Sequence, residues 1–245
     1  MYSATGTNLP QVFVLDNSLR ESTVGQDKGH TLADKVGIYD AVKSCGFRHI
    51  VIGGFNAERQ VDDDFVRHLK GDSNSAIPLS LARERDSSFH GTSSKKTHFY
   101  AFTDPADTVE GGRLIVEPGR EPIALRKMVE YGHINPIIEV ELNGHDLDWD
   151  GAWDVEQMAD ILRKDLEFAY DADMEAGGGF INLRDFPVAM VLVPERVTAL
   201  VASLAHFPNH LRPRGILVEE PMGAYLPCEV RICHASYLWV RVRVS

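Results

Sequence analysis

The segment Asp16-Asn17-Ser18-Leu19-Arg20-Glu21 follows an apolar run and holds an aspartate with an arginine and a glutamate four and five positions later. An aspartate at a strand end can bind a hard divalent cation, and an arginine beside it can stabilise a developing oxyanion. A charged loop in which Asp16 caps a following helix would explain the same residues equally well. Spacing alone therefore leaves a reactive site and a structural loop as equal alternatives for Asp16 and Arg20.

Glu139 and Glu141 form a pair of carboxylates within an apolar run. They are two positions apart, so on a β-strand their side chains share one face. We expect this face to point into the protein, because both faces of a barrel strand are usually covered. Two inward carboxylates would need a metal, a role as a base or cationic partners. The alternative is an outward pair that meets solvent.

Two further pairs of polar residues lie at the ends of apolar runs. Asn182 and Arg184 share a face by the same spacing, and a substrate contact and a strand-terminal ion pair are equally good interpretations. Glu219 and Glu220 close the last clear apolar run, and one of them could face a site. A tight turn would explain these two glutamates equally well.

The elements that must position these residues alternate between β-rich apolar runs and segments of helical period, which is typical of a parallel sheet. The expected strands are 12–15, 49–52, 137–142, 180–183 and 216–218, with 77–82 and 98–102 as candidates for the third strand. The expected helices are 32–44, 62–69, 123–131, 155–171 and 194–205, and 83–96 and 105–122 read as loops. Helical crossovers favour a TIM-type barrel or a doubly wound sheet, and both bind ligands at the carboxyl ends of their strands.

Composition excludes several classes of protein. The 245 residues are 44% hydrophobic, and we expect one domain over 1–245, since an α/β barrel typically needs about 250 residues. A net charge of −11 argues against a sequence-independent nucleic-acid binder. No apolar run approaches the roughly 18 residues that span a bilayer, and the first ten residues lack the pattern of a signal peptide. We therefore expect a cytoplasmic protein without a membrane partner.

The segment 16–21 resembles the signature D-x-x-L-R-[DE] of the DRE-TIM metallolyases. That superfamily includes 2-isopropylmalate synthase, 3-hydroxy-3-methylglutaryl-CoA (HMG-CoA) lyase and 4-hydroxy-2-oxovalerate aldolase. The resemblance extends through Thr31-Leu32-Ala33-Asp34-Lys35, which is similar to a helix start S/T-L-x-x-K, and through a strand at 49–55 that ends in glycine and an aromatic residue. A second match, at 218–230, resembles the sixth-strand motif D-T-x-G followed by P-E-E-V, with Glu220 in the Asp place.

The resemblance implies an α/β TIM-type barrel and a metal-dependent carbon–carbon lyase, or an acyl- or aldol-type condensing enzyme. Its substrate would be a 2-oxo acid or an acyl-CoA, and the reaction would pass through an enolate. Asp16 would bind the divalent metal (Mg, Mn or Zn), Arg20 would stabilise the enolate, and Glu21 would be a supporting or proton-handling carboxylate. The expected substrate contacts are the strand-end residues Glu139, Glu141, Asn182, Arg184 and Glu220.

The sequence also departs from the family. The family takes two metal ligands from an H-x-H on its seventh strand, and no H-x-H occurs in the 245 residues. If Glu220 marks the sixth strand, the 22 residues after Gly223 are too few for two further strand–helix units. The tail 230–245 has no Asp or Glu, and near its end apolar and basic residues alternate as in a strand.

These departures predict a barrel that is incomplete at the C-terminus, with about six strand–helix units plus a short extra strand. A free strand of this kind exposes an edge and favours pairing with another chain, so we expect a homo-oligomer. One alternative is a non-catalytic truncated paralogue that oligomerises through its C-terminal strand. The others are a divergent barrel whose last strand is the tail, and a different TIM-barrel enzyme that uses Glu139, Glu141 and Glu220.

Overall fold

The computed structural model describes residues 14–21, 29–56, 58–71, 97–105, 109–110, 113–114, 122–142, 154–174 and 179–219. Its helices are α1 (Ser18–Glu21), α2 (Leu32–Ser44), α3 (Val61–Leu69), α4 (Ile123–Glu130), α5 (Val155–Asp171), α6 (Phe186–Leu192) and α7 (Pro194–Ala205). Its strands are β1 (His49–Gly54), β2 (His98–Thr103), β3 (Val109–Glu110), β4 (Arg113–Leu114), β5 (Asn135–Glu141), β6 (Phe180–Arg184) and β7 (Gly215–Val218).

Five parallel strands form the main sheet in the order β1-β2-β5-β6-β7. A single parallel bridge between Asp16 and Ile50 places the segment before α1 at the outer edge of β1. Strand order therefore follows chain order without a reversal, whereas a doubly wound sheet would reverse its order at a switch point. The predicted TIM-type barrel is thus confirmed over the doubly wound alternative.

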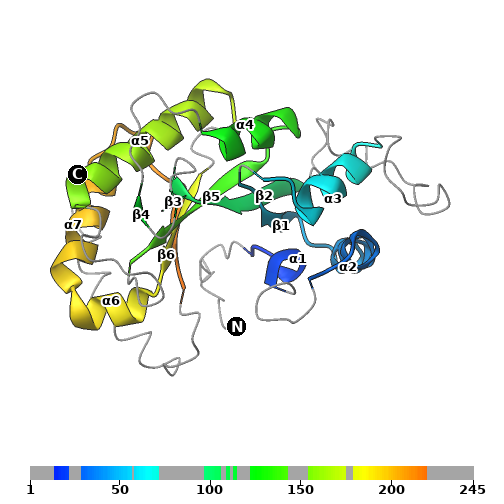
Figure 1. Cartoon of the computed structure of the whole chain (residues 1–245), viewed down its shortest axis with the longest axis horizontal. Helices are drawn as coiled ribbons and strands as arrows, with labels where there is room; N and C mark the ends of the chain where they lie inside the picture. The colour runs from blue at the N-terminus through cyan, green and yellow to red at the C-terminus, as the bar shows by residue number, and fades with distance from the viewer. Residues whose placement is uncertain are drawn as a thin grey trace, which may run out of the picture.

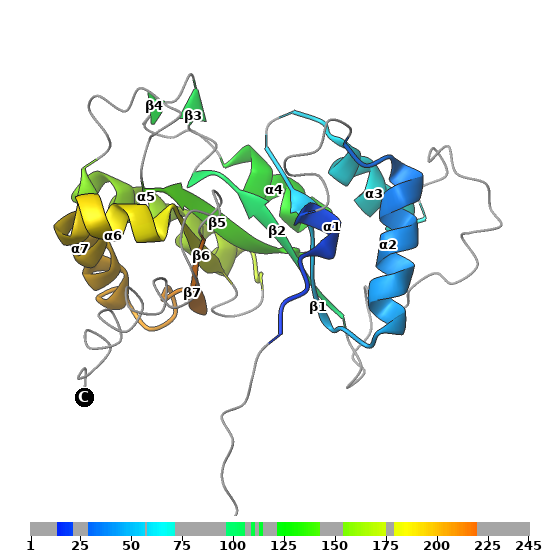
Figure 2. The ribbon, with the colours of Figure 1, turned by 90° about the horizontal axis from the view of Figure 1, so that it is seen from below.

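The helices follow one another around the outside of the sheet without closing a ring. In Figure 1 they run as an arc from α2 and α3, past α4 and α5, to α7. Seen from below, α2 and α3 lie at one end of the sheet and α6 and α7 at the other (Figure 2). In the described part of the chain no strand joins β7 to the Asp16 bridge, so the barrel is open there, as the sequence predicted.

Successive side chains along each strand point alternately to an outer face, which packs against the helices, and to an inner face. The outer face contributes Ile50, Ile52, Phe99, Ala101, Ile138, Val140, Ile181 and Leu183 to the two large clusters around the helices. The inner face consists of Val51, Tyr100, Phe102, Ile137 and Phe180, with Leu15 and Leu217 packed against them. Because both faces are covered, these strands read as nearly continuous apolar runs in the sequence.

Most predicted elements are confirmed to within a few residues, and two capping residues explain where helices begin. Thr31 forms a capping box with Asp34 at the start of α2, and the Asp154 side chain accepts a hydrogen bond from Gln157 N at the start of α5. The short helices α1 and α6 were not predicted, because four to seven residues are too few to show a helical period.

Other predicted elements differ from the structure or fall outside it. The loop expected over 105–122 contains the antiparallel pair β3–β4, whose two-residue strands are too short for an alternating pattern. From the strand expected at 12–15, the structure describes only residues 14 and 15, next to the Asp16 bridge. The candidate strand 77–82 lies outside the described residues, and the candidate 98–102 corresponds to β2, which extends it by one residue.

No single helix among the described residues is long and apolar enough to cross a membrane. The successive helices α6 and α7 meet the length and composition criteria only when taken together, and they are bent by 118° at the break between them.

Candidate active site

Charged side chains gather on the inner face at the carboxyl ends of β5, β6 and β7. In the register of the sheet Glu139 is opposite Asn182, and Glu141 is opposite Arg184. Glu139 shares its face with Ile137, so the two glutamates point inward, as expected for a strand that is covered on both faces. We call Arg20, Glu139, Glu141, Asn182, Arg184 and Glu219 the strand-end cluster.

Glu139 is the centre of this cluster and has three nitrogen partners. Its Oε2 lies 3.2 Å from Arg20 Nη2 and accepts a hydrogen bond of 3.1 Å from Asn182 Nδ2. Its Oε1 lies 3.5 Å from Arg184 Nη1, and Arg184 Nε lies 3.5 Å from Glu141 Oε2. The four strand residues predicted as substrate contacts therefore lie together, and arginines on two elements balance their carboxylates.

Glu219 is a member of the cluster that sequence reasoning did not select. Asn182 Nδ2 donates a second hydrogen bond to Glu219 Oε2. The motif resemblance had favoured Glu220, which lies outside the described residues. Side chains on β7 alternate between the two faces of the sheet. Leu217 packs on the inner face and Val218 on the outer face, so the next residue, Glu219, faces inward.

Arg20 reaches the cluster from α1, a different element from the strands. Its guanidinium carbon lies 3.8 Å from the centroid of the Phe102 ring, and its Nη2 contacts Glu139 beyond that ring. The side chains of Arg20 and Glu139 are 17% and 14% exposed, so the pair is largely shielded from water. A cation held over an aromatic ring beside a carboxylate is fixed in position and direction.

The electrostatics of the cluster perturb two of its groups. Burial raises the pKa of Glu139, and the nearby Glu219 carboxylate raises it further. The positive charges of Arg20 and Arg184 and the hydrogen bond from the Asn182 amide lower it, but the pKa of Glu139 stays above its ordinary value. Burial lowers the pKa of Arg184, but the surrounding carboxylates, Glu139 first, outweigh this and raise it. The cluster thus combines a carboxyl group that can exchange a proton with two permanent positive charges.

The structure describes the surroundings of the Asp16 side chain but not those of the Glu21 side chain, so the predicted roles of both stay predictions. The Asp16 carboxylate accepts hydrogen bonds of 3.2 Å from both the backbone N–H and the hydroxyl of Ser18, so it caps α1. These contacts agree with the capping alternative for Asp16, and its predicted role as a metal ligand stays a prediction. The backbone of Glu21 ends α1, and its side chain lies outside the described residues.

The described residues do not fit a divalent metal centre. No group of three His, Cys, Asp or Glu side chains in that part of the chain is arranged to hold a metal ion. The Asp16 carboxylate is turned to Ser18, and the Glu139 and Glu141 carboxylates face guanidinium groups. A metal bound by Asp16 would need further ligands from outside the described residues.

The fold and the cluster define an open TIM-type barrel with a charged site at the carboxyl ends of its strands, which is where enzymes of this fold carry their active sites. The crystal structure of the HMG-CoA lyase of Bacillus subtilis is similar to this chain, with a TM-score of 0.56 and 14% sequence identity. The match covers 92% of this chain and 63% of the lyase, so this chain spans less than two thirds of that enzyme's length. No protein-family model matches the chain, and no curated protein matches it in sequence.

HMG-CoA lyase is one of the enzymes of the superfamily that residues 16–21 resemble, so the structural comparison and the sequence resemblance lead to the same expected fold. The neighbour therefore agrees with the TIM-type barrel that the resemblance implied. At 14% identity the likeness establishes the fold, and the chemistry must be argued from the side chains.

Proposed function

We propose that this chain is a carbon–carbon lyase, or an enzyme that runs the same aldol- or Claisen-type chemistry in the condensing direction. The substrate would be a 2-oxo acid or an acyl-CoA thioester. The observation that carries the proposal is the contact between Arg20, from the segment that resembles the superfamily signature, and Glu139 at the centre of the inner face. The similarity of the fold to an HMG-CoA lyase supports it.

The cluster contains the groups that bond cleavage would require. Glu139 would take the proton from the substrate hydroxyl, because its raised pKa makes the carboxylate a stronger base. As the carbon–carbon bond breaks, a carbonyl group forms on one fragment and the electron pair of the bond moves into the enolate of the other. Arg20 would stabilise the negative charge on the enolate oxygen, and the enolate carbon would then take up the proton that Glu139 received from the hydroxyl. Arg184 would hold a carboxylate of the substrate.

The test is a substrate panel. The full chain is incubated with 2-oxo acids and acyl-CoA thioesters, alone and with Mg²⁺, Mn²⁺ or Zn²⁺, and new carbonyl products are followed by NMR. We expect turnover by the wild type, and a loss of kcat/KM of about 100-fold or more in Arg20→Gln, the scale of removing an oxyanion stabiliser.

Arg163→Gln is the matched control, since Arg163 forms its ion pairs with Asp160 and Glu167 along α5. It should leave kcat/KM unchanged. No turnover across the panel, or equal rates for Arg20→Gln and Arg163→Gln, would refute the catalytic proposal. Titration of Asp16→Asn with the same ions addresses the predicted role of Asp16: unchanged metal affinity would show that Asp16 is not a ligand.

A second proposal is a non-catalytic protein that oligomerises, and the edge of the sheet favours it. In the described residues β7 pairs only with β6, and Ile216 on β7 is 37% exposed. Such an edge can pair with another chain. Light scattering over a range of concentrations should then show a defined homo-oligomer, and a monomer at every concentration would contradict it.

The cytoplasmic location stays a prediction.

A further inference from the structure

Lys35 is a lysine whose ammonium group is completely buried and contacts three oxygen atoms. It lies on α2, and its side chain is 0% exposed. Its Nζ donates to Leu19 O at 2.9 Å and to Ile52 O at 3.3 Å, and it forms an ion pair with Asp62. Two of its three donors therefore bind carbonyl oxygens, and the carboxylate balances its charge. A buried charge is tolerated only when it is paired in this way.

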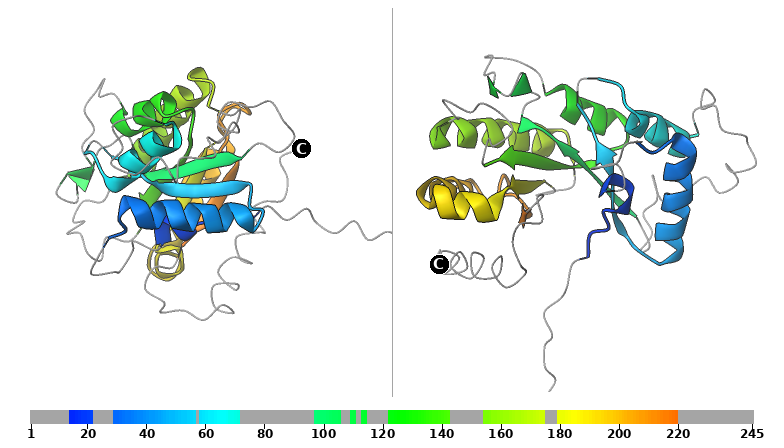
Figure 3. Two further views of the ribbon diagram at one scale, coloured as in Figure 1. Left: turned by 90° about the vertical axis from the view of Figure 1, so that its right-hand side faces the viewer. Right: turned by 60° about the horizontal axis from the view of Figure 1, so that its bottom comes forward.

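The three partners of Lys35 belong to three different elements. Leu19 is the residue before Arg20 on α1, and its carbonyl belongs to the peptide bond that joins it to Arg20. Ile52 lies on β1, and Asp62 is in the first turn of α3. Figure 3 shows α1 beside β1 and α2. Lys35 therefore ties the backbone from which the Arg20 side chain projects to the sheet.

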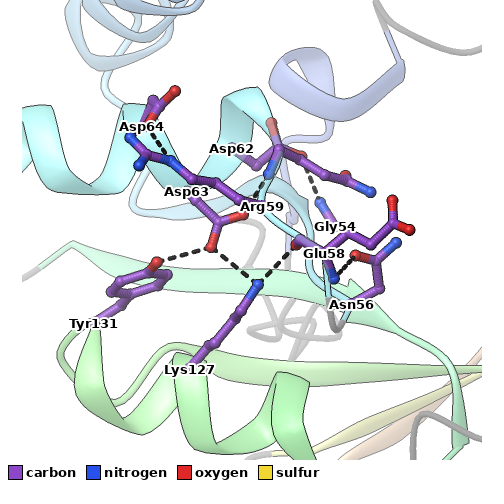
Figure 4. Close-up of polar contacts among 10 residues, drawn as sticks. Gly54, Asn56, Glu58, Arg59, Asp62, Asp63, Asp64, Lys127 and Tyr131 are labelled. Atoms are coloured by element: carbon purple, nitrogen blue, oxygen red, sulfur yellow. Dashed lines mark hydrogen bonds and ion pairs between the residues drawn. The ribbon is translucent and has the colours of Figure 1, made fainter.

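Asp62 is itself held in place at the end of β1. Its Oδ2 accepts a hydrogen bond of 2.8 Å from Gly54 N, as Figure 4 shows. The neighbouring Gly53 has no side chain to obstruct the carboxylate, because a Cβ there would lie 2.2 Å from Asp62 Oδ2. The chain is irregular at this point, with a register shift between Val51 and Gly53. The approach of Asp62 to Lys35 thus depends on β1.

We infer that Lys35, with its partner Asp62, is a positioning residue that holds α1 so that the Arg20 guanidinium lies between Phe102 and Glu139. This inference rests on the proposed function of Arg20. The Leu19 carbonyl that accepts from Lys35 is one peptide unit from the Cα of Arg20, so a shift of that carbonyl moves the Arg20 side chain directly. A displacement of about 1 Å is enough to impair a positioned catalytic group.

A nearby lysine provides the comparison. Lys127 on α4 also contacts a buried aspartate, Asp63, at 3.4 Å, and donates to the carbonyl of Glu58 at 2.7 Å. Figure 4 shows this pair together with Tyr131, which donates to the same Asp63 oxygen at 2.7 Å. These contacts join α4 to α3 and to the loop before α3, not to α1. Loss of Lys127 should loosen the protein without moving Arg20.

The experiment reads the Arg20 guanidinium by NMR, so it does not depend on turnover. Full-length ¹⁵N-labelled wild type, Lys35→Met and Lys127→Met are compared, and the Arg20 signals are assigned by their loss in Arg20→Lys. An arginine held in an ion pair shows separate signals for its two Nη groups, because rotation about its Nε–Cζ bond is slow. We expect separate signals in the wild type and in Lys127→Met, and one merged signal in Lys35→Met.

The double variant Lys35→Met/Asp62→Asn covers the case in which Lys35→Met does not fold. It removes both charges and keeps an acceptor for Gly54 N, so it avoids an unpaired buried carboxylate. It should also merge the Arg20 signals. Separate signals in either folded Lys35 variant, or merged signals in the wild type or in Lys127→Met, would overturn the inference. Lack of turnover by the wild type would count against the proposed function and leave this NMR comparison intact.

Discussion

Gly53→Ala is predicted to be one of the most damaging single-methyl additions to this chain. A Cβ at Gly53 would lie 2.2 Å from Asp62 Oδ2 and 2.3 Å from Asp62 Cγ, well inside any van der Waals contact. The Asp62 carboxylate would have to move and give up its hydrogen bond from Gly54 and its ion pair with Lys35. Gly53 also has a φ of 155°, which residues with a side chain rarely adopt.

The expected loss in the free energy of unfolding follows from the ion pair and the backbone conformation that Gly53→Ala would disturb. Breaking a buried ion pair so that one charge lacks its partner costs about 3 to 5 kcal/mol. An unfavourable backbone conformation adds about 1 to 3 kcal/mol if the chain does not relax. Partial relaxation of α3 would reduce both terms, so we expect a net loss of about 4 kcal/mol. That is a large part of the roughly 5 to 15 kcal/mol that stabilises a typical domain.

The assay is urea unfolding followed by circular dichroism, with Gly37→Ala as the matched control. Gly37 is an exposed glycine on α2, and nothing lies within 4 Å of the Cβ it would gain. Alanine there should raise the free energy of unfolding by about 0.5 to 1 kcal/mol. A loss below about 1 kcal/mol in Gly53→Ala would show that Asp62 does not occupy the described position.

Three further predictions concern pH dependence and capping. Folding raises the pKa of Glu139 above its ordinary 4.5, so the folded protein holds this proton more tightly than the unfolded chain does. The free energy of unfolding of the wild type should therefore fall as the pH rises from 4.5 through the raised pKa. Glu139→Gln should flatten this pH dependence, measured by urea unfolding at each pH. Burial and the hydrogen bond to Asp63 raise the pKa of Tyr131 to about 12, so wild-type stability should fall between about pH 10 and 12, and Tyr131→Phe should lack that fall. Thr31→Ala removes the cap of α2 and should cost about 1 kcal/mol in the same assay, whereas Thr31→Ser should be nearly neutral.

That the strand-end residues share a face was predictable because strand geometry is local. A spacing of two puts Glu139 with Glu141, and Asn182 with Arg184, on one face whatever the rest of the fold does. Which residues meet across strands was not predictable. The pairing of Glu139 with Asn182 depends on the register between β5 and β6, which packing of the whole sheet decides.

The sequence by itself determined the alternation of strands and helices and the segment 16–21 that resembles a superfamily signature. These features depend on neighbours a few residues apart in the chain. Only the tertiary structure decided that Arg20 reaches Glu139, 119 residues away, that Glu219 joins the cluster, and that Asp16 turns to Ser18. Those outcomes depend on how strands pair and where α1 is anchored, which are properties of packing between distant segments rather than of any local pattern.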